Sequence, residues 1–384
     1  MTLVETRPAP AALATLPGPD KPVALVRFGD ALYVGTAAPD PMGRGRIWRM
    51  PWPAGGAAEI VYEGADGSAV TDFAVFESQG TPVLYAATAA LGGGLLLASR
   101  DGRGFGPVAP AGLGQSGNLW LGPLAIAGGR LVVAAGSAAP LDPEASGARL
   151  LASPDPESAV WTALAEPGFG DAENSAIAAL LATGAGLVAA TANPLRGFQL
   201  WQMDPGGGWT RRLTDGAARF SMNPAATALS AGEGELLIGT GAPARPEAED
   251  AAGPAAPEVI ALDDGGAWET LVGEPRFSPE GFKVPFALQA AGFGQRETAC
   301  VTAILTGPGG ALTVVVTAVT GATPGPFGQP GLGASRLWRS LDGGESFAEV
   351  PAPGPVLAAL ATPEGGVLAV AGDAGAALHL HALA

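Results

Sequence analysis

Short apolar runs that end in Gly or Thr recur along the chain and predict a repeated β-strand. The spacings between the ends of successive runs are 52, 48, 55, 49, 77 and 55 residues. One structural unit is therefore repeated, and only the fifth spacing is irregular. The runs lie at Leu32–Thr36, Leu84–Thr88, Leu131–Gly136, Leu187–Thr191, Leu236–Thr240, Leu312–Thr317 and Val367–Gly372.

Each run has strand-like neighbours. An apolar stretch and a Gly-rich turn precede it, as at 125–130 and 181–186, and predict a hairpin. A tight Asp/Gly turn then leads from a third strand into a fourth that often begins with an aromatic residue, such as Trp161, Trp209, Trp268 or Phe347. The third strands are expected at 46–50, 95–99, 149–153, 199–203, 258–262, 336–340 and 377–381. Four short antiparallel strands per repeat predict an all-β, seven-bladed β-propeller.

The repeats fill one domain, 1–384. The last repeat lacks a fourth strand, and Leu13–Val23 lines up with Phe347–Val356. An N-terminal strand near 11–16 is therefore expected to close the last blade. Insertions at 242–257 and 274–298 account for the irregular spacing. The expected blades are 19–64, 69–110, 118–166, 174–214, 223–273, 299–353, and 356–384 with 11–16.

Composition narrows the classes of partner. The chain has 59 Gly, 36 Pro, 47% hydrophobic residues and a net charge of −16. This acidity disfavours nucleic acid and anionic membranes as partners. The N-terminus shows no secretory signal, no apolar run is long enough to span a membrane, and Cys300 has no cysteine to pair with. A cytoplasmic location is expected.

One turn carries a recognisable repeat motif. Ser340–Phe347 reads Ser-Leu-Asp-Gly-Gly-Glu-Ser-Phe and resembles the Asp-box (BNR) repeat, Ser-x-Asp-x-Gly-x-x-aromatic. The resemblance to this propeller family, which includes sialidases, implies that Ser340, Asp342, Gly344 and Phe347 are structural. The Asp would cap its own turn, and the aromatic would pack between blades. Weaker forms lie at 99–105, 153–161, 203–209 and 263–268.

No catalytic set follows the resemblance. The three tyrosines do not lie where a sialidase nucleophile would, and most arginines fall in predicted third strands and outer turns. His379 and His381 are too few for a catalytic zinc site, and Cys300 is expected to be a buried, inert thiol. The sequence predicts neither a metal nor a cofactor.

Polar residues recur near the start of the first strands. Counting back 17 residues from the ends of the second strands gives Thr71, Asn174 and Asn223, and Asn118 lies 18 residues before Gly136. Similar loops precede them, at 112–115, 168–171, 219–222 and 292–295. Two interpretations stay open: the asparagines cap the strand entries, or they bind a ligand at one mouth of the central channel. The charged residues expected at that mouth are Asp72, Arg296 and Glu297.

The second insertion offers a different site. Phe277, Phe282, Lys283 and Phe286 could form a partner-binding patch or fold back onto the ring. The sequence therefore favours a non-enzymatic binding or scaffold module for a protein partner. The alternative is a hydrolase or lyase that acts on a carbohydrate-like or small polar ligand at the channel mouth, with Asp72 and Glu297 as its carboxylates.

Overall fold

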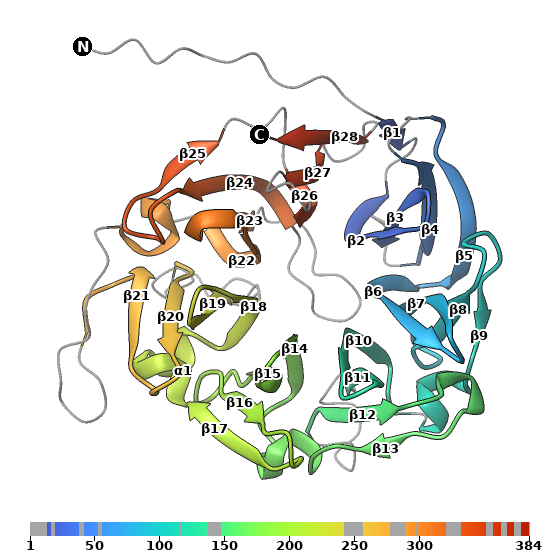
Figure 1. Cartoon of the computed structure of the whole chain (residues 1–384), viewed down its shortest axis with the longest axis horizontal. Coiled ribbons are helices and arrows are strands. Elements are labelled where there is room, and N and C mark those ends of the chain that lie inside the picture. The colour runs from blue at the N-terminus through green and yellow to red at the C-terminus, as the bar shows by residue number, and fades with distance from the viewer. Residues whose placement is uncertain are drawn as a thin grey trace.

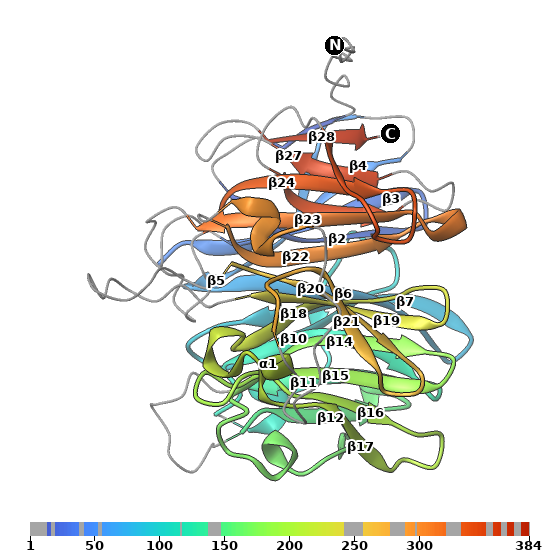
Figure 2. The same ribbon diagram turned by 90° about the vertical axis from the view of Figure 1, so that its left-hand side faces the viewer.

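The computed structural model of the 384-residue chain is a closed ring of β-sheets around a central axis (Figure 1). The strands run along the direction of that axis (Figure 2). The structure describes residues 14–16, 20–37, 42–52, 56–115, 117–136, 147–241, 256–276, 289–295, 298–319, 332–350, 356–361, 367–371 and 378–383.

The strands fall into consecutive antiparallel sets of four. The sets in the first half of the chain are β2 (Lys21–Phe28), β3 (Ala31–Ala37), β4 (Arg44–Pro51) and β5 (Glu59–Asp66); β6 (Ala69–Ser78), β7 (Thr81–Ala89), β8 (Leu96–Ser99) and β9 (Gly106–Pro107); β10 (Trp120–Ala127), β11 (Arg130–Gly136), β12 (Arg149–Ser153) and β13 (Thr162–Ala163); and β14 (Ala176–Thr183), β15 (Gly186–Ala192), β16 (Leu200–Met203) and β17 (Trp209–Leu213).

The second half continues the same order. Its sets are β18 (Ala225–Ala231), β19 (Glu235–Gly241), β20 (Val259–Asp263) and β21 (Trp268–Val272); β22 (Thr298–Thr306), β23 (Leu312–Val319), β24 (Leu332–Ser340) and β25 (Ala348–Val350); and β26 (Val356–Ala361), β27 (Val367–Ala371) and β28 (Leu378–Leu383) with β1 (Ala14–Leu16). Short helical turns lie at Ala111–Gly114, Pro156–Ser158, Pro167–Gly170, α1 (Asp215–Ala218), Phe220–Met222, Ala291–Gly294 and Pro308–Gly310.

Neighbouring sets are linked through their inner strands. Single residue pairs, such as Ala37 with Ala69 and Ala192 with Ala225, join the sets into one four-stranded and two twelve-stranded sheets. The first strands contact one another in the order β2, β6, β10, β14, β18, β22, β26, and β26 contacts β2. β1 pairs antiparallel with β28, with Thr15 opposite His379, so the N-terminal strand completes the last set as predicted.

The hydrophobic cores lie between neighbouring sets. In β11, Leu131 and Val133 pack into the core shared with the preceding set, whereas Val132 and Ala134 pack into the core shared with the next. Each second strand is therefore buried on both faces, which explains why its sequence is a continuous apolar run and not an alternating one.

Each first strand carries a bulge where its pairing with the second strand shifts register. The bulged residues are Val23, Thr71, Gly122 and Pro123, Ala178, Thr227, Thr302 and Leu357. The hydroxyl groups of Thr71 and Thr227 donate to the carbonyl oxygens of Leu121 and Val301 in the next first strand, at 2.5 and 2.6 Å. These hydrogen bonds tie adjacent sets together close to the ring axis.

Side chains of Ser and Asp close turns between third and fourth strands. The Ser340 hydroxyl donates to Asp342 Oδ1 at 2.7 Å and accepts from the Gly344 N–H at 2.8 Å, and the Ser346 N–H donates to Asp342 Oδ1 at 3.0 Å. In β8–β9, Ser99 and Asp101 make the corresponding bonds. Phe347 is buried beside Phe293 and Trp338.

Replacing Asp342 should weaken its turn. Hydrogen bonds from Ser346 and Ser340 lower the pKa of Asp342 to about 2, so its carboxylate stabilises the fold above its ordinary pKa and loses this effect as the pH falls towards 2. We expect Asp342→Ala to melt at a lower temperature than wild type at pH 7. Glu345→Ala, in the same exposed turn, is the matched control. Equal melting of the two variants would contradict the capping role.

Candidate functional site

The predicted polar residues gather at one end of the ring. In an antiparallel set, the starts of the first and third strands share an end with the finishes of the second and fourth. Asn118, Asn174 and Asn223 precede β10, β14 and β18 and lie at this end. We call it the Asn end.

The three asparagines are buried and hydrogen-bonded within the protein. Their Nδ2 atoms donate to the carbonyl oxygens of Gly112, Gly168 and Gly216 at 2.9, 2.8 and 3.1 Å. Their exposed fractions are 3, 0 and 1%. These side chains hold the loop before each first strand, in agreement with the capping interpretation.

A threonine and the residue before a third strand complete the arrangement. The Thr191 hydroxyl donates to Asn174 Oδ1 at 3.1 Å and accepts from the Gln199 N–H at 2.9 Å, while Asn174 Nδ2 donates to Gln199 Oε1 at 3.0 Å. Thr240 and Glu258 repeat this pattern around Asn223. The recurring Thr at the ends of the second strands was visible in the sequence, but its partners were not.

Left-handed turns shape the loops that the asparagines hold. Gly112, Gly168 and Gly292 have φ angles of 63, 59 and 61°, and each is followed by a residue in the same region. In two loops that residue is a phenylalanine that stacks on a third-strand tryptophan: Phe169 on Trp201, with ring centroids 4.8 Å apart, and Phe293 on Trp338 at 4.5 Å. The first turn of each loop therefore packs inward.

The loop before Asn223 corrects the sequence alignment. Its left-handed turn is Gly216–Ala217, whose φ angles are 58 and 53°, and not the segment 219–222 aligned from the sequence. Asn223 Nδ2 bonds the residue seven positions earlier, whereas Asn118 and Asn174 bond residues six positions earlier. One additional residue separates the turn from its asparagine and displaces Phe220 from the packed position.

Thr71 does not occupy the position of the asparagines. It lies at the bulge inside β6, in register with Thr227 of β18 and not with Asn223. The β6–β7 hairpin is longer than the others, so counting back from Thr88 passes the start of β6 too late. The grouping of Thr71 with the asparagines was therefore wrong.

Asp72 follows Thr71 and joins two sets. Its carboxylate oxygens accept hydrogen bonds from the N–H groups of Phe73 at 2.8 Å and Leu124 at 2.7 Å. The side chain is only partly exposed, and burial raises its pKa from 3.8 to about 6. Other first strands carry alanine at this register position, including Ala179 and Ala228.

Replacing Asp72 should change the pH dependence of stability. Because its pKa is raised in the folded state, the protonated form favours folding, and this contribution is lost as the pH rises from about 4 through 6. We expect wild type to lose roughly 2 kcal/mol relative to Asp72→Asn between about pH 4.5 and pH 7.5, measured by urea unfolding. Glu77→Gln, at an exposed position of the same strand, serves as control. Parallel pH curves for wild type and Asp72→Asn would show that Asp72 stays ionised when folded.

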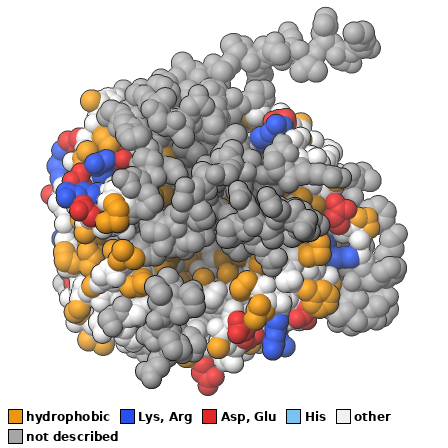
Figure 3. All heavy atoms as spheres, turned by 180° about the vertical axis from the view of Figure 1, so that it is seen from behind, with side chains coloured by type: hydrophobic (Ala, Val, Ile, Leu, Met, Phe, Trp, Pro, Cys, Tyr) orange, Lys and Arg blue, Asp and Glu red, His pale blue; other side chains and the backbone are white. Residues whose placement is uncertain are grey.

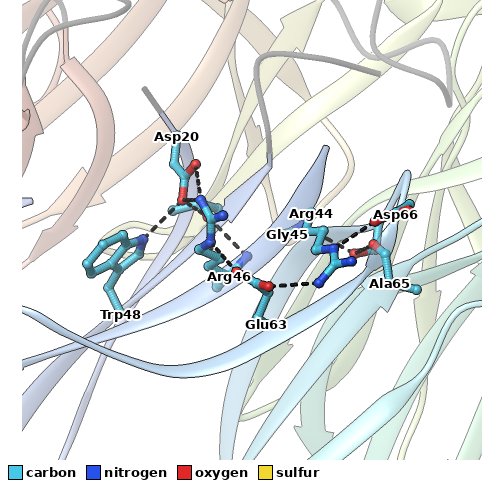
Figure 4. A network of polar contacts seen from close by, with 10 residues as sticks. Asp20, Arg44, Gly45, Arg46, Trp48, Glu63, Ala65 and Asp66 are labelled. Atoms are coloured by element: carbon cyan, nitrogen blue, oxygen red, sulfur yellow. Dashed lines mark hydrogen bonds and ion pairs between the residues drawn. The ribbon is translucent and has the colours of Figure 1, made fainter. Parts of the chain in front are cut away.

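Charged groups take over the bridging role in the first set (Figure 4). Asp20, 5% exposed, precedes β2 and accepts hydrogen bonds from Arg46, Trp48 Nε1 and the Thr36 hydroxyl. Arg46 also donates to Glu63 at 2.8 Å, and Arg44 bridges Glu63 and Asp66. Hydrogen bonds from Arg46 and Arg44 lower the pKa of the Glu63 carboxyl.

A buried cluster of charges lies beside Asn223. Glu258 is fully buried, and its Oε1 accepts from Arg219 at 3.1 Å and from Arg276 at 2.7 Å. Both arginine side chains are 9% exposed. Asn223 Nδ2 donates to Glu258 Oε2 at 2.8 Å. Two cations thus share one anion, and the Nη2 atom of Arg276 is buried without a hydrogen-bond acceptor among the described residues.

Several predicted site residues fall outside the described part of the chain. They are Arg296, Glu297, Phe277, Phe282, Lys283 and Phe286. Cys300 is buried in β22, and burial raises its pKa to about 12. Within the described ranges, no three His, Cys, Asp or Glu side chains gather as metal ligands. No helix among the described residues is long and apolar enough to cross a membrane.

The surface opposite to the view of Figure 1 is mixed in character. Hydrophobic side chains lie beside both acidic and basic ones, and no single sign of charge covers the described part of this face (Figure 3). This surface therefore lacks the uniform charge of a polyanion-binding site.

Comparison with known proteins identifies the fold. No family model matches the chain, and neither does any curated protein. Among solved structures, it is similar to YCF48 bound to D1 peptide (12% identity, 96% of this chain and 94% of that chain, TM-score 0.56). A chain of the mitotic checkpoint complex is also similar (14%, 99% and 98%, 0.54), as is the WD40 β-propeller domain of Doa1 (14%, 96% and 95%, 0.53). The likeness to these propellers and the ring of antiparallel sheets show that the chain is an all-β propeller.

Proposed function

We propose that the chain is a seven-bladed β-propeller that acts as a non-enzymatic binding or scaffold module for a protein partner. The consecutive sets of four strands and the ring of first-strand contacts support the blade number. The Ser and Asp hydrogen bonds at 340–346 and 99–104 support Asp-box turns.

The observation that carries this proposal is how the polar groups of the Asn end are used. Asn118, Asn174 and Asn223 are buried and bonded to the protein itself, so their amide groups hold loops. Asp72 likewise accepts backbone hydrogen bonds at both oxygens. The arrangement supports a rigid platform for a partner more than a reaction centre.

The 274–298 insertion is the proposed edge of the interface, because both of its described ends are fixed on the ring. Arg276 pairs with Glu258, and its Nε donates to the Ala217 carbonyl oxygen at 2.9 Å. At the other end, Gln289 bridges to Val272, and its carbonyl oxygen accepts from the Gly273 N–H at 3.0 Å. Residues 277–288 thus leave and rejoin the ring beside β21. The similar propeller YCF48 was solved with a bound peptide, which supports this use of the fold.

The test replaces residues 277–288 with a short Gly/Ser linker and keeps Arg276 and Gln289. Tagged wild type and variant are purified from native cell extract, and a variant with residues 137–146 replaced is the control. We expect one stoichiometric protein with wild type and control and its loss with the 277–288 variant, at an unchanged melting temperature. Equal recovery from all three chains, or none from wild type, would contradict the proposal.

A further inference from the structure

One loop of the Asn end displays apolar side chains that its counterparts bury. In the loops at Gly168 and Gly292, the following phenylalanine stacks inside the ring. In the loop 215–222, that position is Ala217, 2% exposed, whereas Phe220 and Met222 are 57 and 55% exposed. The apolar side chains of this loop are therefore not used for packing.

The same loop has an unusually strained backbone. Asp215, Ala217, Ala218 and Phe220 have φ angles of 52, 53, 64 and 53°. This left-handed region is unfavourable for residues with a side chain, at about 1–3 kcal/mol each. The counterpart loops each contain one such residue, Leu113, Phe169 or Phe293. Strain of this kind is typical of functional segments, since packing alone does not require it.

A neighbouring turn adds a third apolar side chain. Leu195 is 66% exposed in the turn that links β15 to β16. This turn lies directly against the strained loop: a Cβ on Gly197 would be 2.4 Å from the Phe220 carbonyl oxygen, and the Asn193 N–H donates to the Pro224 carbonyl oxygen at 2.7 Å. Leu195, Phe220 and Met222 are therefore presented by two packed loops. We call them the Phe220 patch.

Carboxylates border the patch. Asp215 begins the strained loop, Glu173 precedes Asn174, and Glu274 lies two residues before Arg276, which donates to Ala217. None of these three acids forms an ion pair among the described residues. The exposed cation nearby is Arg196, 3.9 Å from Asp171. With a chain charge of −16, this border favours a basic partner.

We propose that the Phe220 patch docks a segment of a protein partner in which an apolar side chain is flanked by Lys or Arg. The apolar group covers Phe220, Met222 and Leu195, and the cations face the bordering carboxylates. The proposal rests on the proposed function and names the surface and the chemistry of the partner.

The test uses the full chain and fluorescein-labelled synthetic peptides, followed by fluorescence anisotropy. One peptide has a Leu-Phe centre with two lysines on each side; the others replace the lysines with glutamates, or Leu-Phe with two serines. We expect the lysine peptide to bind at least about tenfold more tightly than the others, and about tenfold more weakly to Phe220→Ser/Met222→Ser. Val160→Ser, at a 66% exposed apolar residue between β12 and β13, should bind like wild type. Binding should weaken between about 50 and 300 mM NaCl.

A second variant tests the strain independently. Glycine tolerates positive φ, so Phe220→Gly should melt at a higher temperature than Phe220→Ser while binding the peptide equally weakly. Equal binding of the glutamate or serine peptide, unchanged binding by Phe220→Ser/Met222→Ser, or no binding of the lysine peptide would overturn the proposal. If it fails while replacement of 277–288 still abolishes partner recovery, the scaffold function stands and the docking surface lies elsewhere.

Discussion

Glu258→Gln should strongly destabilise the ring, by about 3–5 kcal/mol in the free energy of unfolding. The substitution removes the anion shared by Arg219 and Arg276, whose side chains are only 9% exposed, and leaves two cations without a carboxylate. Denaturant unfolding followed by tryptophan fluorescence measures the effect.

Two further variants separate this cause from a general loss of polarity. Glu349→Gln breaks the exposed ion pair with Arg336, in which the charged atoms are 3.6 Å apart, and should cost less than about 1 kcal/mol. The double variant Glu258→Gln/Arg276→Gln should recover part of the loss, because it removes one of the uncompensated cations. If Glu258→Gln unfolds like Glu349→Gln, the buried cluster does not stabilise the protein.

Removing β1 should weaken the closure of the ring. Deletion of residues 1–16 takes away Ala14–Leu16, which pair with β28, but keeps Asp20 and its contacts to Arg46. The deletion exposes the edge of β28, so we expect a lower melting temperature and concentration-dependent aggregation. Deletion of residues 1–13 leaves the paired residues in place and is the control.

Light scattering and calorimetry on the two truncations make the comparison direct. The shorter truncation should behave like wild type, because the described pairing begins at Ala14. If both truncations melt like wild type, the contact between β26 and β2 holds the ring closed without the N-terminal strand.

The strands could be predicted from the sequence because their signals are local. Trp209–Leu213, expected as a fourth strand, is β17, and Leu32–Thr36 lies inside β3. A buried strand needs only a short apolar run bounded by turn residues, so a few neighbouring positions suffice. The asparagines were found in the same way, through their repeated distance from a strand end.

The remaining errors have physical causes. Counting from Thr88 placed Thr71 with the asparagines because hairpin length was assumed constant, and β6–β7 is longer. The Glu258 cluster joins residues from three separate segments through the closed ring, a proximity that no sequence period carries. Asp20 was missed because it performs with a carboxylate what Asn174 performs with an amide.

The sharing of each second strand between two cores has a consequence for how the ring comes apart. An open array of repeats can fray from its ends, since a terminal repeat has only one neighbour. Here, loss of the set β10–β13 would strip one wall from each of two cores at once. The ring therefore has no cheap partial opening among these sets, and its amide protons in β11 should exchange only through global unfolding.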